Sequence, residues 1–97
     1  MSVPKEFTIF GEKHKVKLVK SIDKGKTYGE WDPNKNTIKI EKALSSNPDK
    51  MEQTFLHELI HCCLDHLSYL ELNKDEEFVD TLSKALHQAL KTSGIWK

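Results

Sequence analysis

The sequence lacks net charge and long apolar runs, and each absence excludes a class of protein. Its 15 basic and 15 acidic side chains cancel, so electrostatics gives no reason to expect nucleic acid or an anionic membrane as a partner. No apolar run is long enough to cross a bilayer, and residues 1–10 lack the apolar core of a signal peptide. We therefore expect a cytoplasmic protein without a transmembrane segment.

Cysteine is also scarce. Cys62 and Cys63 are the only two, and they are adjacent in a helical pattern. Neighbouring cysteines cannot build the long-range disulfide framework of a small secreted protein. We interpret both as buried free thiols, with a role in metal binding or redox chemistry as the alternative.

The length and the apolar pattern predict one α+β domain over residues 1–97. Alternating apolar residues predict an N-terminal antiparallel sheet of three to four strands. These strands are expected near residues 7–9, 16–22, 27–31 and 37–40. Two helices should follow, over about residues 48–68 and 75–93. A core this small would be stabilised by a structural metal or a partner.

Polar residues indicate where the two helices begin. Ser46 is expected to cap the first helix, with Pro48 in its first turn. Asn73 is expected to cap the second helix, and Gly94 follows its last turn. The predicted order along the chain is therefore sheet, helix, helix.

A possible metal motif, His57-Glu58-Leu59-Ile60-His61, lies in the first helix. Residues four apart differ by only about 40° around a helix, so both imidazoles can reach one tetrahedral zinc ion. Glu58 is rotated by about 100° from His57, so it can miss the metal and still touch a water bound to it. We predict that His57 and His61 bind one Zn²⁺ ion and that Glu58 is the general base for attack on a carbonyl. The alternative is a solvated helix face that carries these residues.

A third metal ligand must come from elsewhere in the chain. His66 lies nine residues after His57 and points to the opposite side of a continuous helix, so we interpret it as a surface or partly buried histidine. Glu76 lies about 60° from the apolar stripe of the following helix, whereas Glu77 points about 160° away from it. Because a residue on the flank can face the neighbouring helix, Glu76 is the predicted third ligand. Its alternative role is the N3 carboxylate of a capping box with Asn73.

Other polar residues are candidates for supporting roles. Asp80 follows the predicted carboxylate ligand by one turn and could accept a hydrogen bond from the second nitrogen of a ligand histidine. An exposed helical aspartate is the alternative, and Asp65 is a weaker candidate for the same role. Tyr28, Tyr69 and His87 could stabilise an oxyanion, but no spacing places them near the metal.

The histidine motif followed by the helix that begins at Glu76 resembles the gluzincin branch of zinc metallopeptidases. Thermolysin-like enzymes carry their third ligand as a Glu with an Asp four residues later, which Glu76 and Asp80 match. ImmA/IrrE-type metallopeptidases of phages and mobile elements have a similar pattern, with Phe-Ala where this chain has Leu82-Ser83. The layout is most similar to minigluzincins and to small phage-encoded metallopeptidases, including SprT-like proteins. The resemblance covers about residues 27–90.

This resemblance implies a zinc endopeptidase of a bacterial or phage-infected cell that cleaves few protein or peptide substrates. An extended substrate would pair along an edge strand, which by order would lie near residues 37–40. The chain departs from the family at Ile60, where many relatives have glycine. It also has no counterpart of the C-terminal subdomain that forms half of the cleft in large gluzincins, so we expect weak binding of general substrates.

Two other functions are compatible with these residues. The domain could be a non-catalytic zinc-binding module for interaction or regulation. It could also be a latent peptidase whose metal is blocked by a chain terminus or by Cys62 or Cys63. No pattern in the sequence indicates the substrate, the cleavage specificity or the oligomeric state.

Overall fold

Four strands form one sheet in the computed structural model, which describes residues 3–22, 25 and 27–96. The strands are β1 (Glu6–Ile9), β2 (Glu12–Val19), β3 (Gly29–Asp32) and β4 (Thr37–Glu41). They lie in the order β1-β2-β4-β3. Helices follow the sheet along the chain, so the predicted α+β class is confirmed.

The sheet is mixed rather than antiparallel. β1 with β2 and β3 with β4 are antiparallel pairs, but β2 and β4 run parallel, from Lys15 opposite Thr37 to Val19 opposite Glu41. The prediction of an antiparallel sheet is therefore wrong at this central pair. Alternating hydrophobicity identifies a strand and its buried face, but it carries no information about which strand becomes the neighbour. Here the chain passes beyond the position of β4 to form β3 and then returns between β3 and β2.

β3 is an edge strand, and β4 lies inside the sheet. Among the described strands, β3 pairs with β4 alone. Ile38 and Ile40 of β4 are fully buried, as expected for a strand with a neighbour on both sides. The expectation that residues 37–40 form the exposed edge is therefore wrong, and the edge beside the helices is Gly29–Asp32.

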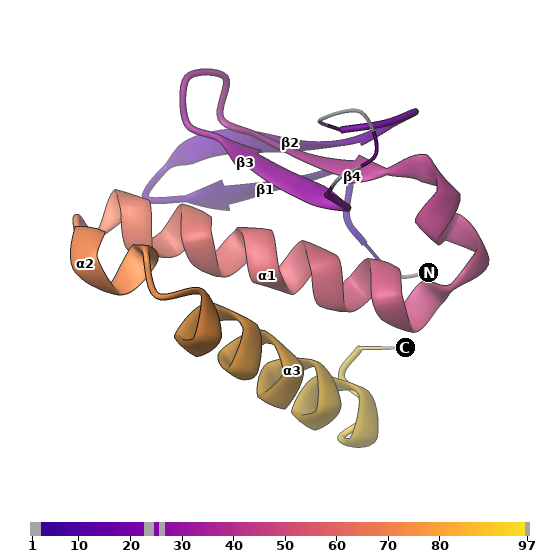
Figure 1. Cartoon of the computed structure of the whole chain (residues 1–97). Helices are drawn as coiled ribbons and strands as arrows, with labels where there is room; N and C mark the ends of the chain where they lie inside the picture. The colour runs from indigo at the N-terminus through magenta and orange to yellow at the C-terminus, as the bar shows by residue number, and fades with distance from the viewer. Residues whose placement is uncertain (1–2, 23–24, 26, 97) are drawn as a thin grey trace.

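The long helix α1 (Pro48–His66) lies across one face of the sheet (Figure 1). Its apolar side meets the buried face of β4, and together they form the main core of the molecule. That core consists of Ile38, Ile40, Leu44, Met51, Phe55 and Leu56. The sheet therefore holds α1 in a fixed orientation, which determines where its polar sides point.

Asn47 caps α1, with its side chain accepting a hydrogen bond from the backbone N–H of Lys50 at 3.3 Å. Pro48 occupies the first helical position, where a missing N–H leaves no hydrogen bond unmade. Ser46 does not cap α1 as predicted. It ends the preceding 3₁₀ helix, Lys42–Ser46, and its hydroxyl donates to the carbonyl of Ala43 at 3.1 Å.

Two further helices complete the fold, α2 (Leu70–Asn73) and α3 (Glu76–Thr92). α3 runs back alongside α1 on the side away from the sheet (Figure 1). Asp75, not Asn73, caps α3, since its carboxylate accepts the backbone N–H of Phe78 at 3.0 Å. Across the described residues, no helix has both the length and the apolar character that a membrane crossing requires.

A buried charge joins α1 to α3. Glu52 of α1 is only 1% exposed, and its carboxylate lies 2.9 Å from His87 Nε2 and 3.3 Å from Lys91 Nζ. A carboxylate removed from water in this way is stable only with such partners. The group therefore fixes the C-terminal half of α3 against the first turns of α1.

Candidate metal centre

His57, His61 and Glu76 meet between α1 and the start of α3. The Oε1 atom of Glu76 lies 3.0 Å from His57 Nε2 and 3.2 Å from His61 Nε2. One ligand atom from each of the three residues lies within 4.8 Å of the others. The two imidazoles come from consecutive turns of α1, with ring centroids 5.1 Å apart. The fold thus brings Glu76 to His57 and His61, which lie 19 and 15 positions before it in the sequence.

Glu76 reaches the histidines because it is the first residue of α3. With Asp75 as the cap, Glu76 occupies position N1 and not N3, so the capping-box role considered for it is ruled out. Glu77 contributes to a different hollow, beside Phe78 and Leu82. The carboxylate that faces the histidines is therefore that of Glu76.

The second nitrogen of each histidine faces an oxygen. His61 Nδ1 lies 2.6 Å from the side-chain oxygen of Asn73, and His57 Nδ1 lies 3.5 Å from Asp80 Oδ1. The hydrogen bond from Lys84 and the charge of its ammonium group lower the pKa of Asp80, so its carboxylate stays ionised. Such contacts fix the tautomer and the orientation of a metal-binding imidazole.

Asn73 belongs to the candidate centre although the sequence predicts it only as a helix cap. Its role depends on the short helix α2, which places its side chain beside His61. Asp65, the weaker candidate for the same role, does not approach the site. Its carboxylate accepts the indole N–H of Trp31 at 3.0 Å instead.

The donor set fits a zinc ion. An amide oxygen can only accept, so His61 donates its Nδ1 proton to Asn73, which leaves Nε2 as the nitrogen that would coordinate a metal. That nitrogen lies 3.2 Å from the carboxylate of Glu76, so the two groups point at the same place. Two imidazole nitrogens and one carboxylate oxygen are the ligands of many catalytic zinc sites, which leave a fourth position open. The Glu76 side chain is 65% exposed, so this side of the group is open to solvent.

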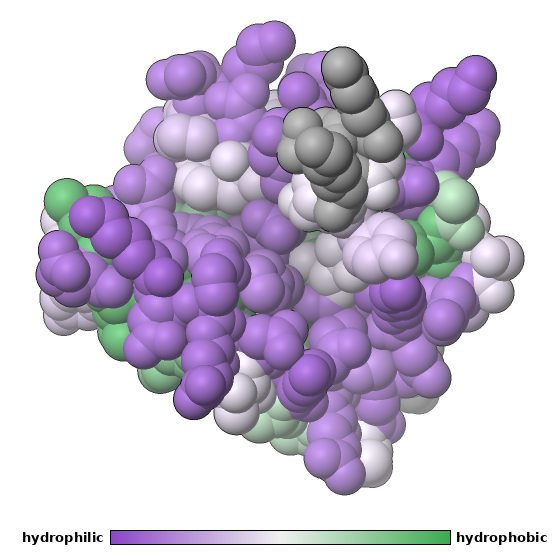
Figure 2. Space-filling view, viewed as in Figure 1, coloured by the Kyte–Doolittle hydropathy of each residue, from purple (hydrophilic) through white to green (hydrophobic). Residues whose placement is uncertain are grey.

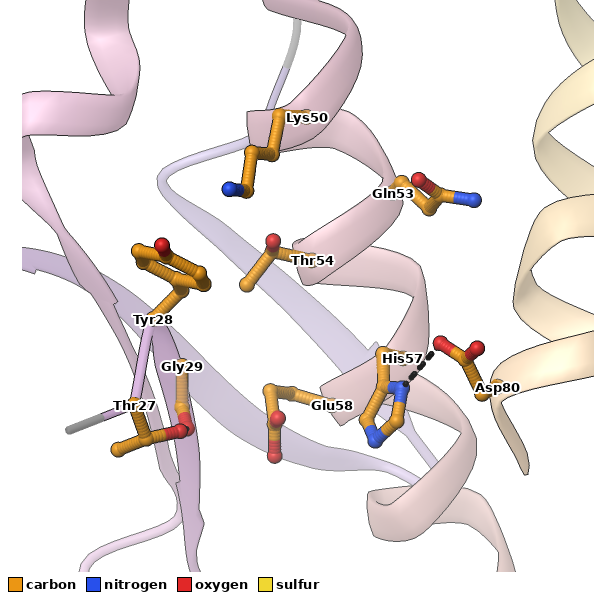
Figure 3. Close-up of a pocket in the computed structure, with 9 residues that line it drawn as sticks. All are labelled: Thr27, Tyr28, Gly29, Lys50, Gln53, Thr54, His57, Glu58 and Asp80. Carbon is orange, nitrogen blue, oxygen red and sulfur yellow. Dashed lines mark hydrogen bonds and ion pairs between the residues drawn. The ribbon is translucent and has the colours of Figure 1, made fainter. Parts of the chain in front are cut away.

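Glu58 lies between the ring of His57 and strand β3, as Figure 3 shows. It is close to the strand, since a Cβ atom added at Gly29 would stand 3.0 Å from Glu58 Cγ. The backbone N–H of Trp31 hydrogen-bonds to the Glu58 carboxylate. Burial raises the pKa of Glu58, while His57 and His61 oppose that effect. The carboxylate therefore sits beside the predicted ligands and is held by the edge strand.

A polar hollow runs along β3 on both sides of Glu58. One part is lined by Thr27, Tyr28, Gly29, Lys50, Gln53, Thr54, His57, Glu58 and Asp80 (Figure 3). The adjoining part continues past Trp31 to His61, Asn73 and Glu76. The surface on this side of the molecule is mostly hydrophilic (Figure 2). An extended chain could lie in this hollow with β3 on one side and the histidines on the other.

The three residues considered for oxyanion stabilisation lie in different places. Tyr28 lines the hollow beside Glu58, where Lys50 Nζ stands 3.9 Å from the centre of its ring. Tyr69 belongs to a separate hollow around α2, and His87 pairs with Glu52. Only Tyr28 of the three is therefore near the candidate centre.

Comparison with known proteins does not assign this chain to a family. No protein-family model matches the chain, and neither a curated protein nor a solved structure matches it. The resemblance to gluzincins therefore depends on the residues themselves, namely the two histidines, Glu58, Glu76 and Asp80.

Proposed function

We propose that this protein is a zinc-dependent endopeptidase of the gluzincin type, acting on an extended protein or peptide segment. The observation that carries the proposal is the position of Glu76. Its carboxylate meets the Nε2 atoms of both motif histidines, while Glu58 lies beside them against the edge strand. Three metal-binding groups and a nearby carboxylate are the minimum that this chemistry requires.

Each residue has a distinct role in the proposed reaction. Zinc held by His57, His61 and Glu76 would lower the pKa of a coordinated water to about 7 and polarise the scissile carbonyl. Glu58 takes the proton of the attacking water and passes it to the leaving amine. Asn73 and Asp80 hold the two imidazoles in orientation through Nδ1.

The edge strand supports an extended substrate. A peptide can add to an exposed sheet edge through backbone hydrogen bonds, which align the chain without selecting its sequence. β3 offers such an edge next to Glu58. A substrate on β3 would therefore present its carbonyl groups along the hollow that contains Glu58 and the histidines.

The proposal is tested with purified protein loaded with about one equivalent of zinc at the His57–His61 site. Unstructured proteins and peptide libraries are incubated with the wild type and with Glu58→Gln, and cleavage is followed by mass spectrometry. We expect cleavage by the wild type and a loss of at least about 100-fold in Glu58→Gln, with zinc content unchanged. Glu77→Gln, which changes a neighbouring carboxylate outside the site, should retain activity.

Two results would oppose the enzyme reading. Equal behaviour of wild type and Glu58→Gln on every substrate would remove the assigned role of Glu58. A stable partner that binds both of these proteins but not His57→Ala would favour a zinc-binding interaction module instead.

A further inference from the structure

A second group of metal-binding side chains lies between β2 and the end of α1. It consists of His14 from β2 with Cys62 and His66 from α1, and one ligand atom of each lies within 4.8 Å of the others. His14 and Cys62 are fully buried, and His66 is partly exposed. The group contains none of the residues of the candidate zinc site, and its sulfur ligand gives it a different chemistry.

The hydrogen bonds of His14 direct a lone pair into this group. His14 Nδ1 lies 2.9 Å from the backbone carbonyl of Glu12, which can only accept, so this nitrogen carries the proton. The Nε2 atom is then an acceptor and lies 2.8 Å from His66 Nε2. A ring nitrogen held by a backbone carbonyl, with the other nitrogen free to coordinate, is the usual arrangement of a metal-binding histidine.

Cys62 supplies the third group. It lies four residues before His66, so both side chains project from the same face of α1. Within the described part of the chain, its sulfur makes no hydrogen bond, although it is fully buried. Aromatic rings surround the histidines. Phe7 stacks on His14 at 5.0 Å, and Trp31 lies 5.9 Å from His66.

We propose that His14, Cys62 and His66 bind a second zinc ion, which has a structural role and joins the sheet to the C-terminal end of α1. Thiolate and imidazole together select Zn²⁺ over Mg²⁺ or Ca²⁺. On binding, Cys62 loses its thiol proton to solvent, and the proton of His66 moves from Nε2 to Nδ1. Without metal, His14 and His66 are held together by the hydrogen bond between their Nε2 atoms.

Cobalt(II) distinguishes the two sites, because only the second contains sulfur. Thiolate coordination to cobalt produces an intense near-ultraviolet charge-transfer band, which two histidines and a glutamate cannot produce. We expect wild-type protein to take up about two equivalents of cobalt, with this band. Cys62→Ser should lose the band and one equivalent, whereas the adjacent Cys63→Ser should keep both. The double variant His57→Ala/His61→Ala should lose one equivalent and keep the band.

A second variant separates metal binding by these residues from the hydrogen bond that joins His14 to His66 without metal. The side-chain amide of His66→Gln can still donate to His14 Nε2, but it is a poor zinc ligand. We expect His66→Gln to melt like the metal-free wild type and to gain no stability from a second equivalent of zinc. The proposal is overturned if wild-type protein saturates at one equivalent without the band, or if the band survives in Cys62→Ser. It is also overturned if zinc stabilises His66→Gln as much as the wild type.

Discussion

The side-chain oxygen of Asn73 lies 2.6 Å from Nδ1 of His61. This contact leaves the other nitrogen of the ring directed at Glu76, 3.2 Å away. A four-residue helix, Leu70–Asn73, separates the two long helices and supplies this contact. The short helix is therefore part of the candidate metal centre as well as a connection between α1 and α3.

Removing the oxygen of Asn73 should weaken metal binding. Asn73→Ala deletes the acceptor for His61 Nδ1, so the imidazole loses its fixed tautomer, and we expect zinc affinity to fall by about 10–100-fold. Asn73→Asp keeps an acceptor and should bind zinc at least as tightly as the wild type. Competition with a chromophoric chelator measures both affinities. Equal affinity of Asn73→Ala and wild type would show that the contact has no role in metal binding.

Substitutions of the two glutamates at the start of α3 should have very different effects on zinc affinity. Glu76→Ala removes a predicted ligand, and we expect its zinc affinity to fall by more than about 100-fold, beyond the range for an orienting residue. Glu77→Ala has the same change in charge and a neighbouring position, so its zinc affinity should remain close to that of the wild type. The same chelator competition measures both, and a larger effect at Glu77 would refute the assignment.

Gly29 should be needed for the approach of β3 to α1. A Cβ atom there would stand 2.7 Å from Thr54 Cγ2 and 3.0 Å from Glu58 Cγ, both closer than van der Waals contact. We expect Gly29→Ala to displace Glu58, reducing peptide cleavage while zinc content stays constant, and to cost about 1–3 kcal/mol of stability. The double variant Gly29→Ala/Thr54→Ser lacks the Cγ2 atom and should recover part of both losses. No recovery would mean that the strain lies elsewhere.

The buried carboxylate of Glu52 should contribute to stability rather than to the site. Glu52→Gln removes the charge that His87 and Lys91 share, and we expect it to lower the free energy of unfolding by about 2 kcal/mol. Glu71→Gln is the matched control, because its side chain is 95% exposed and its ion pair with Lys74 is a surface contact. Chemical denaturation of both variants tests this, and equal midpoints would contradict it.

The sequence by itself determined the features that depend on spacing within one element. Helical periodicity places His57 and His61 on one face of α1 and Glu58 beside them, because a residue's direction follows from its position along the helix. The same periodicity directed Glu76, rather than Glu77, toward α1. The order of the strands and the two long helices also followed from local patterns of apolar and turn-forming residues, whereas the short helix α2 was not predicted.

Only the tertiary structure decided which elements meet. The parallel pairing of β2 with β4 and the edge position of β3 depend on the path of the chain between strands. The sequence predicts Asn73 as a helix cap, but the cap is Asp75, and the folding of α2 against α1 places Asn73 beside His61. His14 and His66, 52 residues apart, come together because α1 packs on the sheet. Such contacts arise from packing between distant segments, which local spacing does not encode.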